Sequence, residues 1–204
     1  MARTRAALAG LVMALTLPLA ARADDVAQMP VVWLALDQKA PQPSTMLEPP
    51  PTDLGIAGAR VALAENQTTG RFTGQNWTLE EHVAKDDAGV MAAAHAVLAA
   101  GRRLIVTDLP APLLLKVADL PDAKDALLLD AETSDDSLRA ADCRRNVLHL
   151  MPSRAMLADA LMQYLIVKGW THIMLAVGPQ PADKLMAEAY RNSAKKFRIE
   201  IVED

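Results

Sequence analysis

Short apolar runs alternate along the chain with longer segments of helical periodicity. Residues 31–36 (VVWLAL) are continuously apolar, which is typical of a strand buried on both faces of a parallel sheet. Residues 77–83 alternate apolar and polar positions, which indicates a half-buried strand. Further short apolar runs predict strands at residues 104–106, 126–129, 147–150, 173–177 and 199–202.

Helical patterns separate these strands. We expect helices over residues 55–65, from Asp86 or Asp87 to Gly101, over residues 113–120, from Ser153 to Gly169, and over residues 182–197. The polar segment 66–75, which contains Gly70 and Gly74, is expected to be a loop. Strands that alternate with helices predict the α/β class, a parallel sheet with helices on both faces.

Two of these helices carry apolar stripes that we expect to face the core. In the second helix the stripe consists of Val90, Ala94, Val97 and Leu98. In the helix that follows Pro152, Ser153 is the expected N-cap. The expected stripe of that helix consists of Leu157, Leu161, Tyr164 and Leu165.

Residues 1–23 have the composition of a secretory signal peptide. Arg3 and Arg5 precede an apolar run at residues 7–17, and Ala21-Arg22-Ala23 supplies an A-x-A cleavage site. The run is shorter than the ~20 apolar residues that span a bilayer, which favours cleavage over the alternative, an uncleaved membrane anchor. We therefore expect an exported protein, located in the periplasm of a Gram-negative cell.

The chain has 204 residues, of which 51% are apolar and 23% are charged, and its net charge is −4. This composition argues for a globular chain, and the lack of a basic surplus argues against nucleic acid as a partner. The single cysteine, Cys143, excludes an intrachain disulfide, and the four scattered histidines predict no metal site. No cofactor is expected.

Catalytic motifs are missing from the sequence. It contains no G-x-S-x-G, P-loop, G-x-G-x-x-G or H-E-x-x-H motif. His149, Ser153 and Asp159 are close in sequence, but an N-cap role accounts for Ser153 better than a Ser-His-Asp triad does. The prediction is a protein that is not an enzyme and has no catalytic residue; an exported α/β hydrolase is the weaker alternative.

The order of elements places any ligand site in the loops that follow the strands. In open α/β sheets, ligands bind outside the carboxyl ends of the strands, where loops and helix starts meet. The loops that follow the predicted strands are residues 37–38, 108–111, 130–134 and 178–181. We expect a binding site to be built from these loops.

Three segments give the chain a resemblance to a known family. Residues 58–66 (GARVALAEN), 83–110 and 146–178 resemble the periplasmic substrate-binding proteins of branched-chain amino acid type ABC transporters, which have the type I binding-protein fold. Residues 58–75 and 142–161 resemble a subgroup of that family associated with pyrroloquinoline-quinone (PQQ)-dependent alcohol dehydrogenase systems. The resemblance covers about residues 30–204.

The resemblance implies two α/β lobes that close on a ligand about a hinge. The first lobe is expected at residues 24–150, the hinge crossing at Met151-Pro152, and a partial second lobe at residues 153–204. Two lobes of about 150 residues each need roughly twice this length, so we expect a truncated or fragmentary chain.

The same resemblance implies a periplasmic solute-binding component of an ABC-type uptake system. Its expected partners are a small-molecule solute and the membrane permease of an ABC transporter. The alternative is a periplasmic accessory or sensor module of a PQQ-dependent alcohol oxidation system without transport. In that case, a quinoprotein dehydrogenase system is the expected partner.

The expected first-lobe wall of the ligand site is formed by Asp108, Ala111, Glu132, Thr133 and Ser134. The family places small hydroxyl residues after the third strand, where they hold the carboxylate of an amino acid. Here this loop is DLPAP (residues 108–112), which has no hydroxyl, and its two prolines lack the N–H that an anion needs. This departure argues against an amino acid as the solute.

Overall fold

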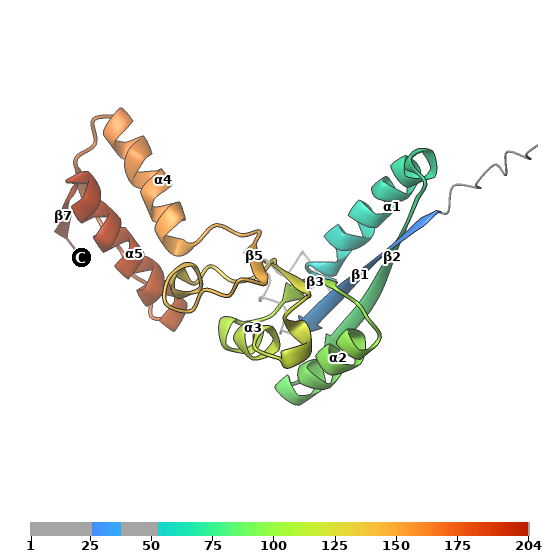
Figure 1. Cartoon of the computed structure of the whole chain (residues 1–204). Coiled ribbons are helices and arrows are strands. Elements are labelled where there is room, and N and C mark those ends of the chain that lie inside the picture. The colour runs from blue at the N-terminus through green and yellow to red at the C-terminus, as the bar shows by residue number, and fades with distance from the viewer. Residues whose placement is uncertain (1–25, 38–52, 204) are drawn as a thin grey trace, which may run out of the picture.

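The computed structural model describes residues 26–37 and 53–203. The expected signal peptide at residues 1–23 and most of the Pro-rich segment 38–53 lie outside the described residues. Five parallel strands form one sheet in the order β2-β1-β3-β4-β5 (Figure 1). The strands are β1 (Ala27–Leu36), β2 (Gln75–Ala84), β3 (Leu104–Asp108), β4 (Leu127–Asp130) and β5 (Val147–His149).

Helices lie on both faces of this sheet, which confirms the predicted fold class. Helix α1 (Ile56–Thr73) lies on one face, and α2 (Asp87–Ala99) and α3 (Ala111–Ala118) lie on the other (Figure 1). Two 3-10 turns, η1 (Pro121–Ala123) and η2 (Asp136–Arg139), flank β4. We call residues 26–149 the five-stranded unit.

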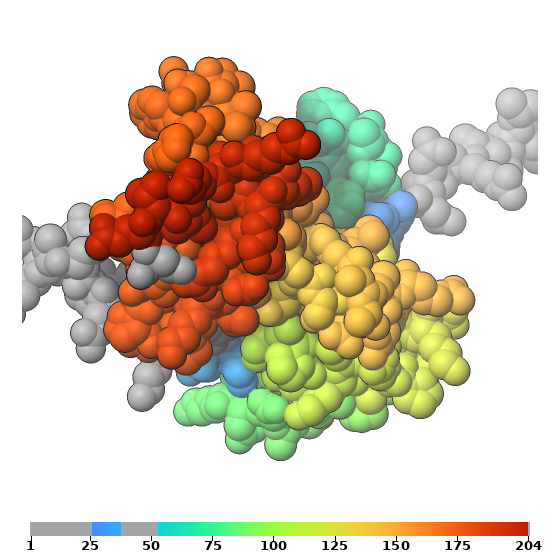
Figure 2. All heavy atoms as spheres, turned by 90° about the vertical axis from the view of Figure 1, so that its left-hand side faces the viewer, coloured from blue at the N-terminus to red at the C-terminus, as the bar shows by residue number. Residues whose placement is uncertain are grey.

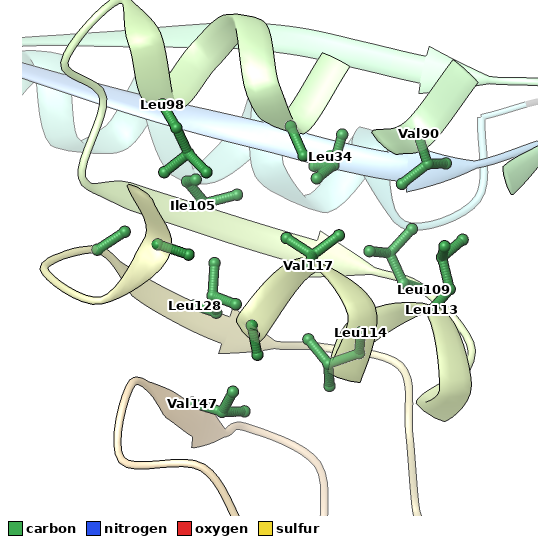
Figure 3. Packing of buried hydrophobic residues seen from close by; sticks show 14 of the residues in the cluster. Leu34, Val90, Leu98, Ile105, Leu109, Leu113, Leu114, Val117, Leu128 and Val147 are labelled. Carbon is green, nitrogen blue, oxygen red and sulfur yellow. The ribbon is translucent and has the colours of Figure 1, made fainter. Parts of the chain in front are cut away.

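The main core fills the space between the sheet and the pair α2 and α3. Leu34, Ile105 and Leu128 of three neighbouring strands are completely buried there. Figure 3 shows them packed against side chains of both helices, including Val90, Leu98, Leu113, Leu114 and Val117. The continuous apolar strands of the sequence are therefore strands whose inner faces are fully buried, as parallel sheets require.

The rest of the chain forms a smaller unit, residues 154–203, which we call the C-terminal unit. It contains α4 (Arg154–Val167), β6 (His172–Met174), α5 (Pro181–Phe197) and β7 (Glu200–Glu203). Strands β6 and β7 pair in parallel, and a small core of Met162, Ala194 and Ile199 joins them to the two helices. In Figure 2 this unit (orange to red) lies against the yellow segment around residues 130–150.

Two predicted helix starts are confirmed. An oxygen of Asp86 accepts a hydrogen bond from the N–H of Gly89 at 2.7 Å and caps α2, whose four predicted stripe residues are all buried. The hydroxyl of Ser153 accepts from the N–H of Met156 at 3.3 Å and caps α4. Both caps satisfy N–H groups that would otherwise have no partner within the helix.

The predicted loop at residues 66–75 is wrong, because α1 continues to Thr73. Gly70, interpreted as a loop residue, is buried in the helix where α1 lies against β2. A Cβ at this position would lie 2.4 Å from the carbonyl oxygen of Gln75, so the glycine permits close packing of helix on strand. The helix ends at Gly74, whose φ of 66° is typical of a glycine C-cap.

The predicted buried stripe of α4 is also wrong in part. Leu157, Leu161 and Tyr164 are exposed by 44%, 41% and 53%. The buried side chains are Ala158 and Met162, which face α5, and Leu165 is half-buried beside them. The apolar residues of α4 itself are distributed around its whole circumference. Periodicity alone therefore does not determine which side of the helix packs against α5.

Among the described residues, no helix is both long enough and apolar enough to cross a membrane.

The close contact between α1 and β2 predicts that adding one methyl group at Gly70 strongly lowers the stability of the protein. Gly70→Ala should destabilise the protein by about 1–3 kcal/mol, because its Cβ collides with backbone that cannot rotate away. Gly58→Ala, in the same helix, should be neutral or stabilising, because nothing lies within 4 Å of its Cβ. Urea unfolding of both variants measures the difference, and equal stabilities would contradict this account of the packing.

Candidate functional site

The carboxyl ends of β3, β4 and β5 bring ionisable side chains to one edge of the sheet. Asp108 ends β3, Asp130 ends β4 and His149 ends β5. The parallel register pairs Thr107 with Asp130 and Asp130 with His149 across neighbouring strands. This is the edge at which open α/β sheets bind ligands.

The Asp108 carboxylate lies against the start of α1. A Cβ placed on Gly55, the residue before this helix, would lie 2.9 Å from Asp108 Oδ2 and 2.9 Å from Cζ2 of Trp33. Gly55 has a φ of 77°, a conformation that side chains with a Cβ rarely adopt. The glycine therefore leaves room for the carboxylate next to the buried indole of Trp33.

Asp108 has an altered acidity in this position. Its burial, and in second place the negative charge of Glu132, raises the pKa of Asp108 from its ordinary value of 3.8 to about 6. Both causes disfavour the charged form of the carboxyl group. A nearby positive charge would act in the opposite direction and lower the pKa of Asp108.

Asp130 is completely buried and is the hydrogen-bonding centre of the loop after β4. Its Oδ1 accepts from the N–H groups of Glu132 at 3.2 Å and Thr133 at 3.0 Å. Its Oδ2 accepts from the hydroxyl of Thr133 at 3.1 Å and lies 2.8 Å from Nδ1 of His149. Thr133 is thus buried with both its N–H and its hydroxyl bonded, and it supports the loop from within.

The other predicted residues have different placements. Glu132 is exposed and lies near enough to Asp108 to influence its charge. The carbonyl oxygen of Ser134 accepts from the N–H of Arg154 at 2.9 Å, which links this residue to α4. Ala111 is the first residue of α3, two residues before the predicted start of that helix.

The start of α3 offers little to an anion. The N–H groups of Leu113 and Leu114 already donate to the carbonyl oxygen of Pro110, at 2.9 and 3.0 Å. Pro112 has no N–H, so in this turn Ala111 alone retains a donor that is not directed into the helix. Helix N-termini bind carboxylates through several such donors, which this one lacks.

The loop after β4 also fixes the start of the C-terminal unit. Arg154 Nη1 contacts Asp135 Oδ1 at 2.6 Å, and Asp136 Oδ1 accepts from the N–H of Ala155 at 3.0 Å. Arg139 donates to the carbonyl oxygen of Met151, in the crossing between the two units. Loop and helix start are therefore joined by several contacts.

The residues of the hydrolase alternative do not converge. His149 contacts Asp130, the Ser153 hydroxyl caps α4, and Asp159 binds Ser193 and Lys196 of α5. The described part of the chain also contains no group of three or more His, Cys, Asp or Glu side chains that could hold a metal ion. The contacts of His149, Ser153 and Asp159 give each of these residues a structural role.

A groove of about 440 Å³ lies between η2, the start of α4 and α5. Half of its twelve lining residues are charged, and of these Arg154 is paired with Asp135 and Lys196 with Asp159. Both cations of the groove are therefore already paired with an acid of this chain.

The structure places the predicted site residues Asp108 and Glu132 at one edge of the sheet, whereas sequence reasoning did not foresee the contact between Asp130 and His149. The available signal was a polar residue that ends each of two apolar runs, LLLD and VLH. A polar residue at the end of a strand can face solvent, or its side chain can bond to the loop that follows. The sequence does not show which of these two arrangements is present. Asp130 is buried below this edge, where its contact with His149 joins the loop after β4 to the end of β5.

Comparison with known proteins shows the fold. No protein-family model and no curated protein matches the chain. Three solved structures that resemble it are an ABC transporter substrate-binding protein from Desulfitobacterium hafniense, a leucine-, isoleucine-, valine-, threonine- and alanine-binding protein from Brucella ovis, and a branched-chain amino acid ABC transporter periplasmic ligand-binding protein from Burkholderia xenovorans.

These three structures are 20%, 17% and 16% identical in sequence to the chain, with TM-scores of 0.61, 0.62 and 0.66. The matches cover 87%, 86% and 86% of this chain, but only 49%, 46% and 46% of the solved chains. The chain thus spans about half the length of the structures it resembles. A further structure of the Desulfitobacterium protein is described as a complex with Leu.

The altered acidity of Asp108 predicts a pH dependence of stability. Its folded pKa of about 6 lies above the ordinary value of 3.8, so the folded state binds this proton more tightly. The resulting stabilisation is present at low pH and is lost as the pH rises through 6. When the pH is raised from about 4 to about 8, the free energy of unfolding should therefore fall less for Asp108→Asn than for the unaltered protein.

Urea unfolding at the two pH values measures this difference. Asp122→Asn is the matched control, because Asp122 is an exposed acid in η1, before β4 and at the opposite edge of the sheet. The control should follow the pH dependence of the unaltered protein. Parallel curves for Asp108→Asn and the unaltered protein would contradict the burial of this carboxylate.

Proposed function

We propose that this chain binds a small solute at the carboxyl edge of the five-stranded sheet, as the solute-binding component of an ABC-type uptake system. The observation that carries the proposal is the pair of acids, Asp108 and Glu132, at the ligand edge of a fold shared with substrate-binding proteins. The solute is bound and released without chemical change. The membrane permease of the transporter is the proposed partner.

The proposed arrangement assigns a role to each part of the chain. Residues 1–23 direct export to the periplasm, residues 24–150 are the first lobe, and residues 153–204 belong to a second lobe. Met151-Pro152 is the proposed pivot, because these residues connect the last strand of the sheet to the N-cap of α4. Closure about this pivot would hold the solute between the lobes.

The chemistry of the edge favours a cationic solute, such as an amine, over one that presents a free carboxylate. Asp108 and Glu132 supply negative charge, and the Thr133 hydroxyl is already bonded to Asp130. The start of α3 has few N–H groups for an anion. An ammonium group between the two acids would relieve their repulsion and lower the pKa of Asp108.

The accessory role in a PQQ-dependent system remains the second hypothesis. No contact among the described residues favours it over solute binding, and the solved structures reported above are substrate-binding proteins. Stabilisation by a partner protein instead of a solute would favour the accessory role.

Thermal unfolding with a panel of solutes tests the proposal. The panel contains small amines and diamines, neutral alcohols, and amino acids including leucine. An amine should raise the melting temperature saturably; a ligand at a hundred times its Kd stabilises a protein by about 2.7 kcal/mol. Asp108→Asn and Glu132→Gln should each weaken amine binding by about tenfold to a hundredfold, because a charge-assisted contact is lost.

Asp122→Asn, at the opposite edge, should bind as the unaltered protein does. Stabilisation by leucine but not by amines would contradict the solute class while leaving solute binding in place. Stabilisation by no member of any class would contradict the proposed function itself.

A further inference from the structure

The loop after β4 leaves the sheet between Ala131 and Glu132. The N–H of Ala131 donates to the carbonyl oxygen of Thr107 in β3 at 3.0 Å, and the carbonyl oxygen of Asp130 accepts from the N–H of Leu150 at 2.8 Å. The main chain is thus held from both sides as far as Ala131. Glu132 lies beyond this pairing, so other contacts determine its position.

Those contacts come from the side chain of Asp130. Its Oδ1 accepts from the N–H groups of Glu132 and Thr133, at 3.2 and 3.0 Å. An aspartate side chain that bonds the N–H groups of the next residues in the chain makes a turn at this point. The direction in which Glu132 leaves the sheet therefore follows the orientation of the Asp130 carboxylate.

The orientation of that carboxylate depends on a residue outside the loop. Nδ1 of His149, at the end of β5, lies 2.8 Å from Asp130 Oδ2. The hydroxyl of Thr133 also donates to Oδ2, at 3.1 Å, but Thr133 belongs to the loop and would turn with it. The imidazole is held independently, because β5 pairs with β4 and the His149 side chain is only 11% exposed. His149 therefore joins the carboxylate to the sheet.

The contact also indicates which ring nitrogen of His149 carries a hydrogen. The N–H groups of Glu132 and Thr133 and the hydroxyl of Thr133 all donate to the Asp130 carboxylate. Nδ1 completes this set as a further donor, which places a hydrogen on Nδ1. A substitution that keeps an N–H at this place should keep the contact, and one that removes it should lose the contact.

We propose that His149 is a positioning residue of the solute site: by donating from Nδ1 to Asp130, it holds Glu132 beside Asp108. His149 acts on the solute through Asp130 and Glu132, without touching it. The part of this inference that concerns the solute rests on the proposed function, whereas the placement of Glu132 can be measured without a solute. Residues that share such a network have non-additive effects when they are replaced, which makes the proposal testable.

Two amide variants separate the Nδ1 donor from the rest of the His149 side chain. Measured from the main chain, the NH2 group of an asparagine can take the place of Nδ1, whereas that of a glutamine reaches as far as Nε2. His149→Asn should therefore retain the bond to Asp130, and His149→Gln should lose it. Both replacements are polar, and the NMR spectrum of each variant should be that of a folded protein. His95→Gln is the control, because His95 is an exposed histidine of α2.

The acidity of Asp108 reports the position of Glu132 without a solute. Burial and, in second place, the charge of Glu132 raise the pKa of Asp108 to about 6. NMR titration of the Asp108 carboxyl carbon should therefore give a lower pKa in Glu132→Gln and also in His149→Gln. The pKa of Asp108 should stay unchanged in His149→Asn and His95→Gln. An unchanged pKa in His149→Gln, or an equal fall in His149→Asn, would overturn the proposal.

A double-mutant cycle tests whether His149 acts on the solute through Glu132. The probe is butylamine, or the panel amine that stabilises the protein more, and its Kd is measured for Glu132→Gln, His149→Gln and the double variant. His149→Gln should weaken binding by about threefold to tenfold in the unaltered background, and by less than about twofold when Glu132 is already replaced.

The outcomes separate this inference from the proposed function. Equal losses of affinity in the two backgrounds would overturn the proposal, because His149 would then act by a route that does not include Glu132. Binding of no amine by the unaltered protein would contradict the proposed function. In that case the NMR titration of Asp108 alone decides whether His149 positions Glu132.

Discussion

The buried carboxylate of Asp130 organises the loop after β4, at the edge of the sheet where we propose that the solute binds. A buried carboxylate is costly unless its oxygens accept hydrogen bonds, and both oxygens of Asp130 are occupied by Thr133, Glu132 and His149. These bonds turn the loop after β4 sharply and tie it to the end of β5. The position of Glu132 beside Asp108 and the position of Ser134 beside Arg154 both follow from that turn.

One loop therefore serves two purposes that are usually separated. Its first residues line the edge where we propose that the solute binds, and its later residues, Asp135 and Asp136, hold the start of α4. A solute that contacts Glu132 is only a few residues from the contacts that orient the C-terminal unit. In the proposed function, this short, well-bonded segment connects solute binding with the orientation of the C-terminal unit.

The sequence predicted those elements whose apolar residues mark a single side. The stripe of α2 is buried as predicted, whereas α4 is apolar all round and its buried side depends on where α5 packs. The end of α1 was mispredicted because a buried glycine looks like a loop glycine until β2 is placed against it. The rule for strand ends predicted that Asp108 and the loop with Glu132 lie at the same edge, but the role of Asp130 depends on His149, 19 residues away.

The pairing of Arg154 with Asp135 has a consequence for the medium in which the protein works. Their side chains are 20% and 34% exposed, so dissolved ions reach the pair and screen the attraction between the two charges. Added salt weakens this attachment while leaving the fully buried bonds of Asp130 intact. The movement that we propose for the C-terminal unit about Met151-Pro152 should thus become easier as the salt concentration rises.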